Sequence, residues 1–182
     1  PSIDSHAFQT LNSEMPEISP LTMFDATVVS RLAGKIWRHH YAEIISPDQI
    51  DYMLAQRYCP LLIKSQVSSE AVWWQKMTLD ETIIGFSCYM RTDASDALKI
   101  DKLYIDIDHQ HKGYGALFIA NAMDTMHKNS CNSLILTVNK QNSTAIAAYK
   151  KYGFEIIGDS IVDIGGGYFM NDHLMSMTKL CK

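Results

Sequence analysis

The chain has 182 residues, of which 47% are apolar and 20% are charged, and its formal net charge is −4 with a pI of about 5.9. The composition is that of a globular protein, the mild acidity argues against nucleic acid as the main partner, and no apolar run approaches the roughly 18 residues of a membrane span. The first six residues lack a basic region followed by an apolar one, so we expect no secretory signal and predict a cytoplasmic protein.

The cysteines and histidines show no pattern typical of a cross-link or a metal site. The four cysteines contain no Cys-x-x-Cys pair, and the seven histidines lack ligand spacing. We therefore predict reduced, structural thiols and no bound metal. The cysteines are Cys59, Cys88, Cys131 and Cys181.

The N-terminal region divides into an extension and the start of a domain. Residues 1–16 are polar and aperiodic, which is typical of a loose extension, and residues 17–182 are predicted to form a single domain without a linker. A first strand is expected over residues 18–24.

Two helical stretches follow this strand. Asp25 is a plausible N-cap because apolar residues recur after it at i, i+3, i+4 and i+7. A second helix restarts at Ser46 and either ends before Pro60 or resumes after it. The stripe of the first helix consists of Val29, Leu32, Ala33 and Ile36.

The middle of the chain changes to strand periodicity. Strands are predicted over residues 71–77, 82–90 and 98–107, and their short connections make them antiparallel neighbours. In the third strand, alternation places four residues on one face. They are Asp101, Leu103, Ile105 and Ile107.

The C-terminal half alternates helices and strands. A helix is predicted after Gly115 and a strand over residues 134–138, which gives a crossover between parallel strands. Asn142 or Ser143 caps a last helix that ends at Gly153. Strands over residues 154–162 and 168–180 then form a hairpin around Gly165-Gly166-Gly167.

A glycine-containing turn between a strand and a helix is the main candidate for a binding site. Gln110-x-x-Gly113-x-Gly115 leads directly into a helix, whose first N–H groups lack internal partners and carry partial positive charge. Glycine lets a phosphate approach the backbone closely. The spacing differs from the dinucleotide-binding and P-loop patterns. The remaining alternatives are a diphosphate site and a tight turn without a ligand.

A second segment, one strand later, favours the diphosphate site over a turn without a ligand. Asn142-x-x-Ala145, Tyr149 and Gly153-Phe154 follow the glycine turn at a specific spacing. Together the two segments resemble the GNAT superfamily of acetyl-CoA-dependent N-acetyltransferases. The resemblance extends over roughly residues 18–180 and implies the GNAT-type acyl-CoA N-acyltransferase fold, an α/β fold. Its sheet is mixed and mostly antiparallel, with six or seven strands and helices on both faces.

The resemblance also implies roles for individual residues. The main-chain amides of the turn bind the diphosphate of acetyl-CoA, the cosubstrate, and the strand before the turn pairs with the pantetheine arm where it splays from its neighbour. Asn142 contacts the pantetheine, and Tyr149 is the general acid for the departing thiolate. The implied cofactor-binding residues are Tyr104, Ile105, Ile107, Gln110, His111, Lys112, Gly113, Tyr114, Gly115, Asn142 and Tyr149.

The chemistry of acetyl transfer leaves two roles open. The amine must lose a proton before it attacks, so a general base is needed. Asp101, acting through a water, and Glu43 are the candidates, and either is also explained as a solvated carboxylate. Tyr149 is also explained as a core tyrosine and Asn142 as an N-cap.

The acceptor is predicted to be a primary amine of a small molecule, with polyamines first. The ending from Gly167 to Met175 resembles a branch that contains polyamine acetyltransferases, and the mild acidity suits a cationic substrate. Alternatives are a protein or peptide N-acetyltransferase and a non-catalytic acyl-CoA sensor. An acceptor wall of aromatic side chains and a homodimer are further hypotheses. The aromatic candidates are Trp37, Tyr41 and Trp73 or Trp74.

Overall fold

The computed structural model describes residues 15–92 and 96–178, so nearly all of the predicted extension over residues 1–16 lies outside the described residues. Within these residues, five α-helices and seven strands follow one another in the predicted order, with two short 3-10 helices, Met23–Asp25 and Ile107–His109. The helices are α1 (Ala26–His40), α2 (Pro47–Arg57), α3 (Pro60–Val67), α4 (Tyr114–Lys128) and α5 (Ser143–Lys151). The strands are β1 (Glu17–Pro20), β2 (Val72–Leu79), β3 (Thr82–Arg91), β4 (Ala97–Ile105), β5 (Ser133–Asn139), β6 (Glu155–Gly165) and β7 (Tyr168–Thr178).

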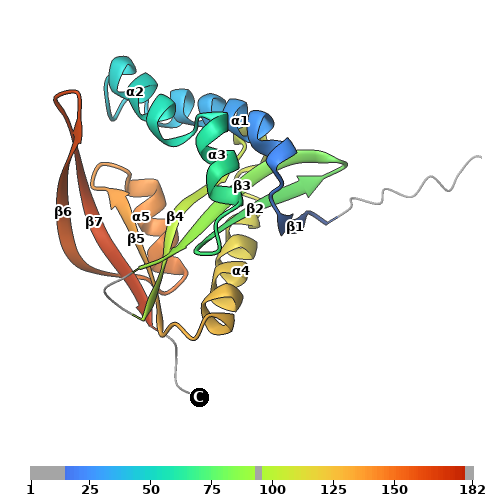
Figure 1. Cartoon of the computed structure of the whole chain (residues 1–182). Coiled ribbons are helices and arrows are strands. Elements are labelled where there is room, and N and C mark those ends of the chain that lie inside the picture. Colours follow the sequence, from blue (N-terminus) through green and yellow to red (C-terminus); the bar gives the residue numbers. More distant parts are fainter. Residues whose placement is uncertain (1–14, 93–95, 179–182) are drawn as a thin grey trace, which may run out of the picture.

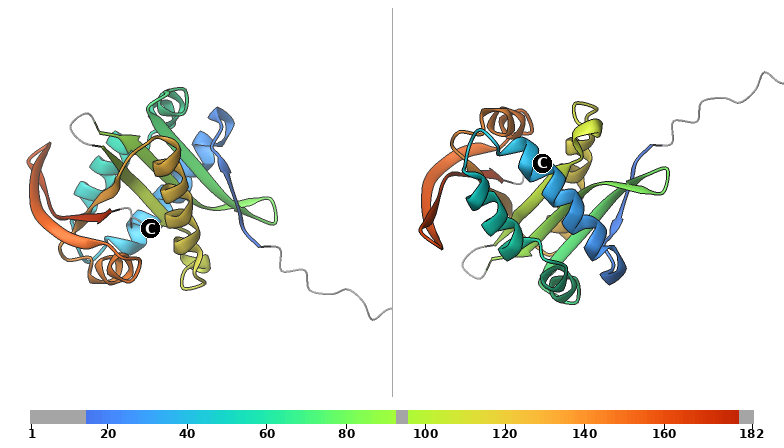
Figure 2. Two further views of the ribbon diagram at one scale, coloured as in Figure 1. Left: turned by 90° about the horizontal axis from the view of Figure 1, so that it is seen from below. Right: turned by 90° about the horizontal axis from the view of Figure 1, so that it is seen from above.

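The strands form one mixed sheet in the order β1-β2-β3-β4-β5-β7-β6. Strands β4 and β5 pair in parallel, as the predicted crossover through α4 requires, and the other described pairs are antiparallel. Helices α1 to α3 cover one face of the sheet and α4 covers the opposite face (Figures 1 and 2). The predicted α/β fold with six or seven strands and helices on both faces is confirmed, with seven strands in the described sheet.

The N-terminal boundaries differ from the prediction for local reasons. Strand β1 ends at Pro20, four residues before the predicted end, and a 3-10 turn follows. Asp25 occupies the N-cap position of α1, but its carboxylate accepts from the backbone of Thr22 and pairs with Lys76 at 2.8 Å instead of capping the helix. Ser46 does cap α2, because its hydroxyl accepts from the Gln49 N–H.

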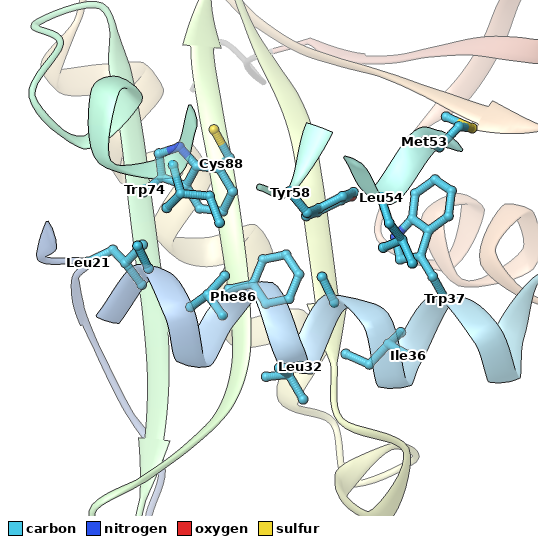
Figure 3. Packing of buried hydrophobic residues seen from close by; sticks show 14 of the residues in the cluster. Leu21, Leu32, Ile36, Trp37, Met53, Leu54, Tyr58, Trp74, Phe86 and Cys88 are labelled. Atoms are coloured by element: carbon cyan, nitrogen blue, oxygen red, sulfur yellow. The ribbon is translucent and has the colours of Figure 1, made fainter. Parts of the chain in front are cut away.

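The larger core lies between α1, α2, α3 and the middle strands. The predicted stripe of α1 is buried, which satisfies its amphipathic pattern. Figure 3 shows Trp37 of α1 beside Leu54 of α2, and Phe86 and Cys88 of β3 belong to the same cluster. A second buried cluster forms on the other face of the sheet between α4, α5 and strands β5 and β7.

A β-bulge in β4 overturns one prediction about side-chain direction. Cys88 pairs with Lys102 and Tyr89 pairs with Ile100, so Asp101 is an extra residue in β4. The bulge turns Asp101 toward Arg57 of α2, whereas Leu103 and Ile105 pack on the α4 side. The expectation that Asp101 shares a face with Leu103 and Ile105 is therefore wrong.

Strand β4 is shorter than predicted. The strand ends at Ile105, and Ile107 lies in the 3-10 turn Ile107–His109 instead of in the strand as predicted. Within residues 15–92 and 96–178, no helix combines the length and apolar character needed to cross a membrane.

Candidate active site

The two parallel strands in the middle of the sheet separate along most of their length. Only Ala97–Lys99 pairs with Ser133–Ile135, although both strands continue beyond these residues. The unpaired stretches, residues 100–105 and 136–139, line a cavity of about 240 Å³. Apart from the Ile105 carbonyl, which accepts from Gln110, backbone groups at these edges are open to pairing with an extended ligand, because a strand edge offers a row of unpaired N–H and C=O groups.

The turn that follows β4 opens into this cavity. Gln110 and Gly115, at the two ends of the predicted loop, both line it. The side-chain amide of Gln110 donates to the Ile105 carbonyl at 3.0 Å, which ties the loop to the end of β4. A Cβ at Gly115 would lie 3.1 Å from the Tyr152 hydroxyl, so close packing against α5 favours glycine at this position.

The tip of the same loop fits an anionic group. Gly113 is the N-cap of the 15-residue α4 and has a φ of 80°, in the left-handed region that favours glycine. A Cβ at Gly113 would meet nothing within 4 Å, so the space beside the helix N-terminus is open. His111, also left-handed with a φ of 61°, and Lys112 are exposed next to it. Helix N–H groups, open space and flanking basic side chains together suit the diphosphate of acetyl-CoA.

An ion-pair cluster fastens the loop to α1. Lys35 lies 2.6 Å from Asp106 and 2.8 Å from Asp108, in the turn between β4 and the loop. The Asp106 N–H donates to the Ile84 carbonyl at 2.7 Å, which connects the same turn to β3. These contacts fix the entrance to the loop relative to the sheet.

Asn142 links α5 to the end of α1. Its side-chain oxygen accepts from the Ala145 N–H at 3.1 Å, so the predicted N-cap is confirmed. That bond orients the amide, so its NH₂ group donates to His40 Nε2 at 2.8 Å, and the His40 proton therefore resides on Nδ1. Burial lowers the pKa of His40, which keeps the ring neutral at pH 7.

Tyr149 lines the cavity from α5. Its ring packs edge-on against Phe154 with 5.6 Å between ring centroids. Burial raises the pKa of Tyr149, so its hydroxyl stays protonated at neutral pH. A protonated hydroxyl is the form that a general acid requires.

The opposite side of the cavity has an aromatic wall. The ring centroid of Trp37 lies 4.5 Å from that of Tyr41 and 5.5 Å from that of Tyr58, and the Tyr41 and Tyr104 hydroxyls are 3.4 Å apart. These four rings all line the cavity, which confirms the placement predicted for Trp37 and Tyr41. The alternatives Trp73 and Trp74 and the candidate base Glu43 do not line it.

Asp101 lies in the cavity wall among three cations. Arg57 Nη2 bonds both carboxylate oxygens at 2.8 and 2.9 Å, Lys102 forms a short ion pair, and Lys99 lies 3.4 Å away. Burial alone would raise the pKa of Asp101, but the charges of Lys102, Arg57 and Lys99 outweigh burial and hold that pKa well below its usual range. Asp101 is therefore ionised at neutral pH and holds a proton only weakly.

The structure adds residues to the cavity wall that the sequence reasoning missed. Arg57 and Tyr58 come from the C-terminal end of α2, His40 from α1 and Asp172 from β7. Of these four residues, only Asp172 could have been suggested by the sequence. It alternates with Met170 and Leu174 in a predicted strand, so a carboxylate stands on the same face as two apolar side chains. Within the described residues, no group of three or more His, Cys, Asp or Glu is arranged to hold a metal ion.

The buried thiols agree with the prediction of structural cysteines. Cys59, Cys88 and Cys131 are free in the described part of the chain. Burial raises the pKa of Cys88 to about 12, so this thiol is protonated and unreactive in the folded protein.

A parallel strand pair that separates beside a turn suited to a diphosphate fits the class of acyltransferase that the sequence resembles. The chain belongs to the acetyltransferase (GNAT) family, whose sequence profile matches residues 31–154. This membership confirms the predicted acetyltransferase with acetyl-CoA as cosubstrate.

Individual relatives agree with this assignment. The chain is 26% identical over 145 residues to a spermidine N(1)-acetyltransferase of Thermoplasma acidophilum, covering 77% of this chain and 88% of that protein. It is 31% identical over 94 residues to the peptidyl-lysine N-acetyltransferase YjaB of Salmonella typhimurium, covering 52% and 57%. The fold matches the PaiA N-acetyltransferase of T. acidophilum, solved with coenzyme A, with a TM-score of 0.76, 22% identity and coverage of 91% of this chain and 100% of that chain.

Proposed function

We propose that this acetyltransferase acts on a primary amine of a small cationic molecule, with polyamines as the first candidates. The observation that carries the proposal is the cavity between β4 and β5, because it joins the proposed acetyl-CoA site to a wall rich in aromatic rings. Aromatic faces attract cations, which suits a polyamine. The similarity to a spermidine acetyltransferase supports the same substrate class.

The cofactor side of the site consists of the predicted residues. Backbone amides from Gln110 through Gly115 bind the diphosphate, with His111, Lys112 and Tyr114 around it, and the free edge at Tyr104 and Ile105 pairs with the pantetheine arm. Ile107, in its 3-10 turn, supports the loop because its carbonyl accepts from the Gln110 N–H at 3.4 Å. Asn142 holds the start of α5 next to the arm.

The reaction is a direct attack of the amine on the thioester that acetyl-CoA supplies. Tyr149 Oη donates its proton to the departing thiolate, in keeping with a hydroxyl that stays protonated. The aromatic wall and strand edges hold the two reactants together, which contributes much of the rate.

Asp101, predicted as the general base, has an environment that suits a different task. Three cations lower its proton affinity, so it is a weak acceptor for the ammonium proton. We propose that Asp101 mainly orients Arg57 and Lys102 in the cavity wall. A base function through a water stays a prediction, as do the homodimer and the cytoplasmic location.

A peptide lysine is the second candidate acceptor, because the chain is similar to a peptidyl-lysine acetyltransferase over about half its length. The experiment that decides is an acceptor panel with acetyl-CoA, containing spermidine, simple monoamines and a lysine peptide, with thiol release as the signal. We expect the highest kcat/KM with the polyamine. A higher kcat/KM for the peptide would favour the second candidate. Coenzyme A binding without turnover of any amine would instead favour a non-catalytic acyl-CoA sensor.

A further inference from the structure

The cavity contains two carboxylates, and only one of them forms ion pairs within the described residues. Asp101 is surrounded by Arg57, Lys99 and Lys102. Asp172 Oδ1 is buried yet has no hydrogen-bond partner among the described residues. A buried carboxylate oxygen without a donor is costly, so its position in a ligand cavity points to a donor supplied by the ligand.

The strand register shows which side of the sheet Asp172 faces. Asp172 lies opposite Asn139 in the antiparallel pair of β7 with β5, so both side chains are on the same face. Met170, two residues earlier on that face, packs against the core under α1 and α2, and its sulfur accepts from the Gln49 amide at 3.8 Å. Asp172 therefore faces the side of Arg57 and Tyr41, whereas Tyr149 packs with the cluster on the other face.

The same register separates Asp172 from the reacting atoms. The acetyl group is expected between β4 and β5, and β7 lies on the far side of β5. Neighbouring strands are about 4.8 Å apart, and an attacking nitrogen must lie about 3–3.5 Å from the carbon it attacks. A side chain that stands on β7 is thus better placed for a second nitrogen of the acceptor than for the attacking one.

We propose that Asp172 forms an ion pair with a second, non-reacting ammonium group of the acceptor and so makes the enzyme selective for diamines and polyamines over monoamines. Asp172 is the specificity-determining residue in this assignment, which rests on the proposed function. Arg57 and Lys102 bind the neighbouring carboxylate, and no described cation forms an ion pair with Asp172, so the ammonium supplies that direct contact. Burial raises the pKa of Asp172 although the charges of Arg57 and Lys99 lower it, and this net direction agrees with a carboxylate that lacks a direct counter-ion.

The test compares Asp172→Asn with wild type on two acceptors of equal length, 1,4-diaminobutane and n-butylamine. Loss of one charged hydrogen bond is expected to raise the KM for the diamine about tenfold or more and to change the KM for the monoamine less than about twofold. The KM for acetyl-CoA should stay constant, and Asp172→Glu should restore part of the selectivity. Asp163→Asn, a change at an exposed carboxylate on β6, is the matched control and should leave all values unchanged.

Contrary results of this kinetic test would refute one of two claims, the assignment of Asp172 or the proposed function. A wild-type KM for the diamine in Asp172→Asn, in protein that coenzyme A still protects against heat, overturns the assignment of Asp172 but leaves the acetyltransferase intact. Equal losses for diamine and monoamine also overturn it, since they would place the carboxylate at the attacking nitrogen. Absence of turnover of every amine by the wild-type enzyme would instead refute the proposed function.

Discussion

Asp101 holds together the charged part of the cavity wall, and Asp101→Asn removes its charge with little change in shape. The side chain of Asp101 is 7% exposed and that of Lys102 only 2% exposed, so Lys102 would remain buried without a counter-ion. The ammonium lies 5.4 Å from the Tyr58 ring centroid and 5.1 Å from that of Trp74, and these contacts compensate for the lost charge only in part.

Breaking a buried ion pair by removing one partner costs about 3–5 kcal/mol. We therefore expect Asp101→Asn to lower the free energy of unfolding by that amount at pH 7, a large part of a typical total of about 5–15 kcal/mol. The double variant Asp101→Asn/Lys102→Met removes both charges and should recover most of the loss. Asp124→Asn, at an exposed pair with Lys128 on α4, is the control and should cost less than about 1 kcal/mol.

The pH dependence supplies a second check on the same reasoning. The pKa of Asp101 is lower in the folded protein than in the unfolded chain, so its contribution to stability is fully present above about pH 4 and is lost as the pH falls through the folded-state pKa. Urea unfolding at several pH values measures this. A difference of less than about 0.5 kcal/mol between wild type and Asp101→Asn at pH 7 would refute the assignment of a tightly coupled buried cluster.

Three further predictions concern the proposed site and the core. Tyr149→Phe should lower kcat by about 10²-fold or more while coenzyme A still raises the melting temperature, and unchanged turnover across the pH range would remove Tyr149 as the acid. Gly113→Glu should abolish coenzyme A binding, measured by calorimetry, because its left-handed backbone disfavours a side chain and a carboxylate repels the diphosphate; normal binding by a folded variant would contradict the loop assignment. Cys88, whose pKa is raised to about 12, should resist a thiol reagent in the native protein and react on unfolding; rapid native labelling would argue against its burial.

Much of the fold could be predicted because its local signals agree with one another. The stripe of α1, the crossover through α4 and the hairpin of β6 and β7 each follow from periodicity and turn residues. The sequence located the turn proposed to bind the cofactor, because Gln110-x-x-Gly113-x-Gly115 lies between a predicted strand and a predicted helix. The roles of its individual residues came from the family resemblance and stay predictions.

The acceptor side could not be predicted in the same way. Arg57, Tyr58 and Asp172 come from α2 and β7, far apart in the sequence, and they meet only through the order of strands in the sheet. The sequence around Asp101 contains no glycine or other turn residue that would indicate a bulge. A prediction based on strict alternation therefore placed the Asp101 side chain on the wrong face of the sheet.

The bulge also connects the fold to the chemistry. Pairing between β4 and β5 stops at Lys99, and the extra residue Asp101 follows two positions later. A bulge increases local twist and re-aims side chains, so one irregularity accounts both for the separation of the strands and for a carboxylate in the acceptor wall. The sheet then divides the site, with Tyr149 packed on one face and Asp101 and Asp172 on the other. In this arrangement the proposed acid lies in an apolar environment, where it keeps its proton, while Asp101 and Asp172 lie on the opposite face.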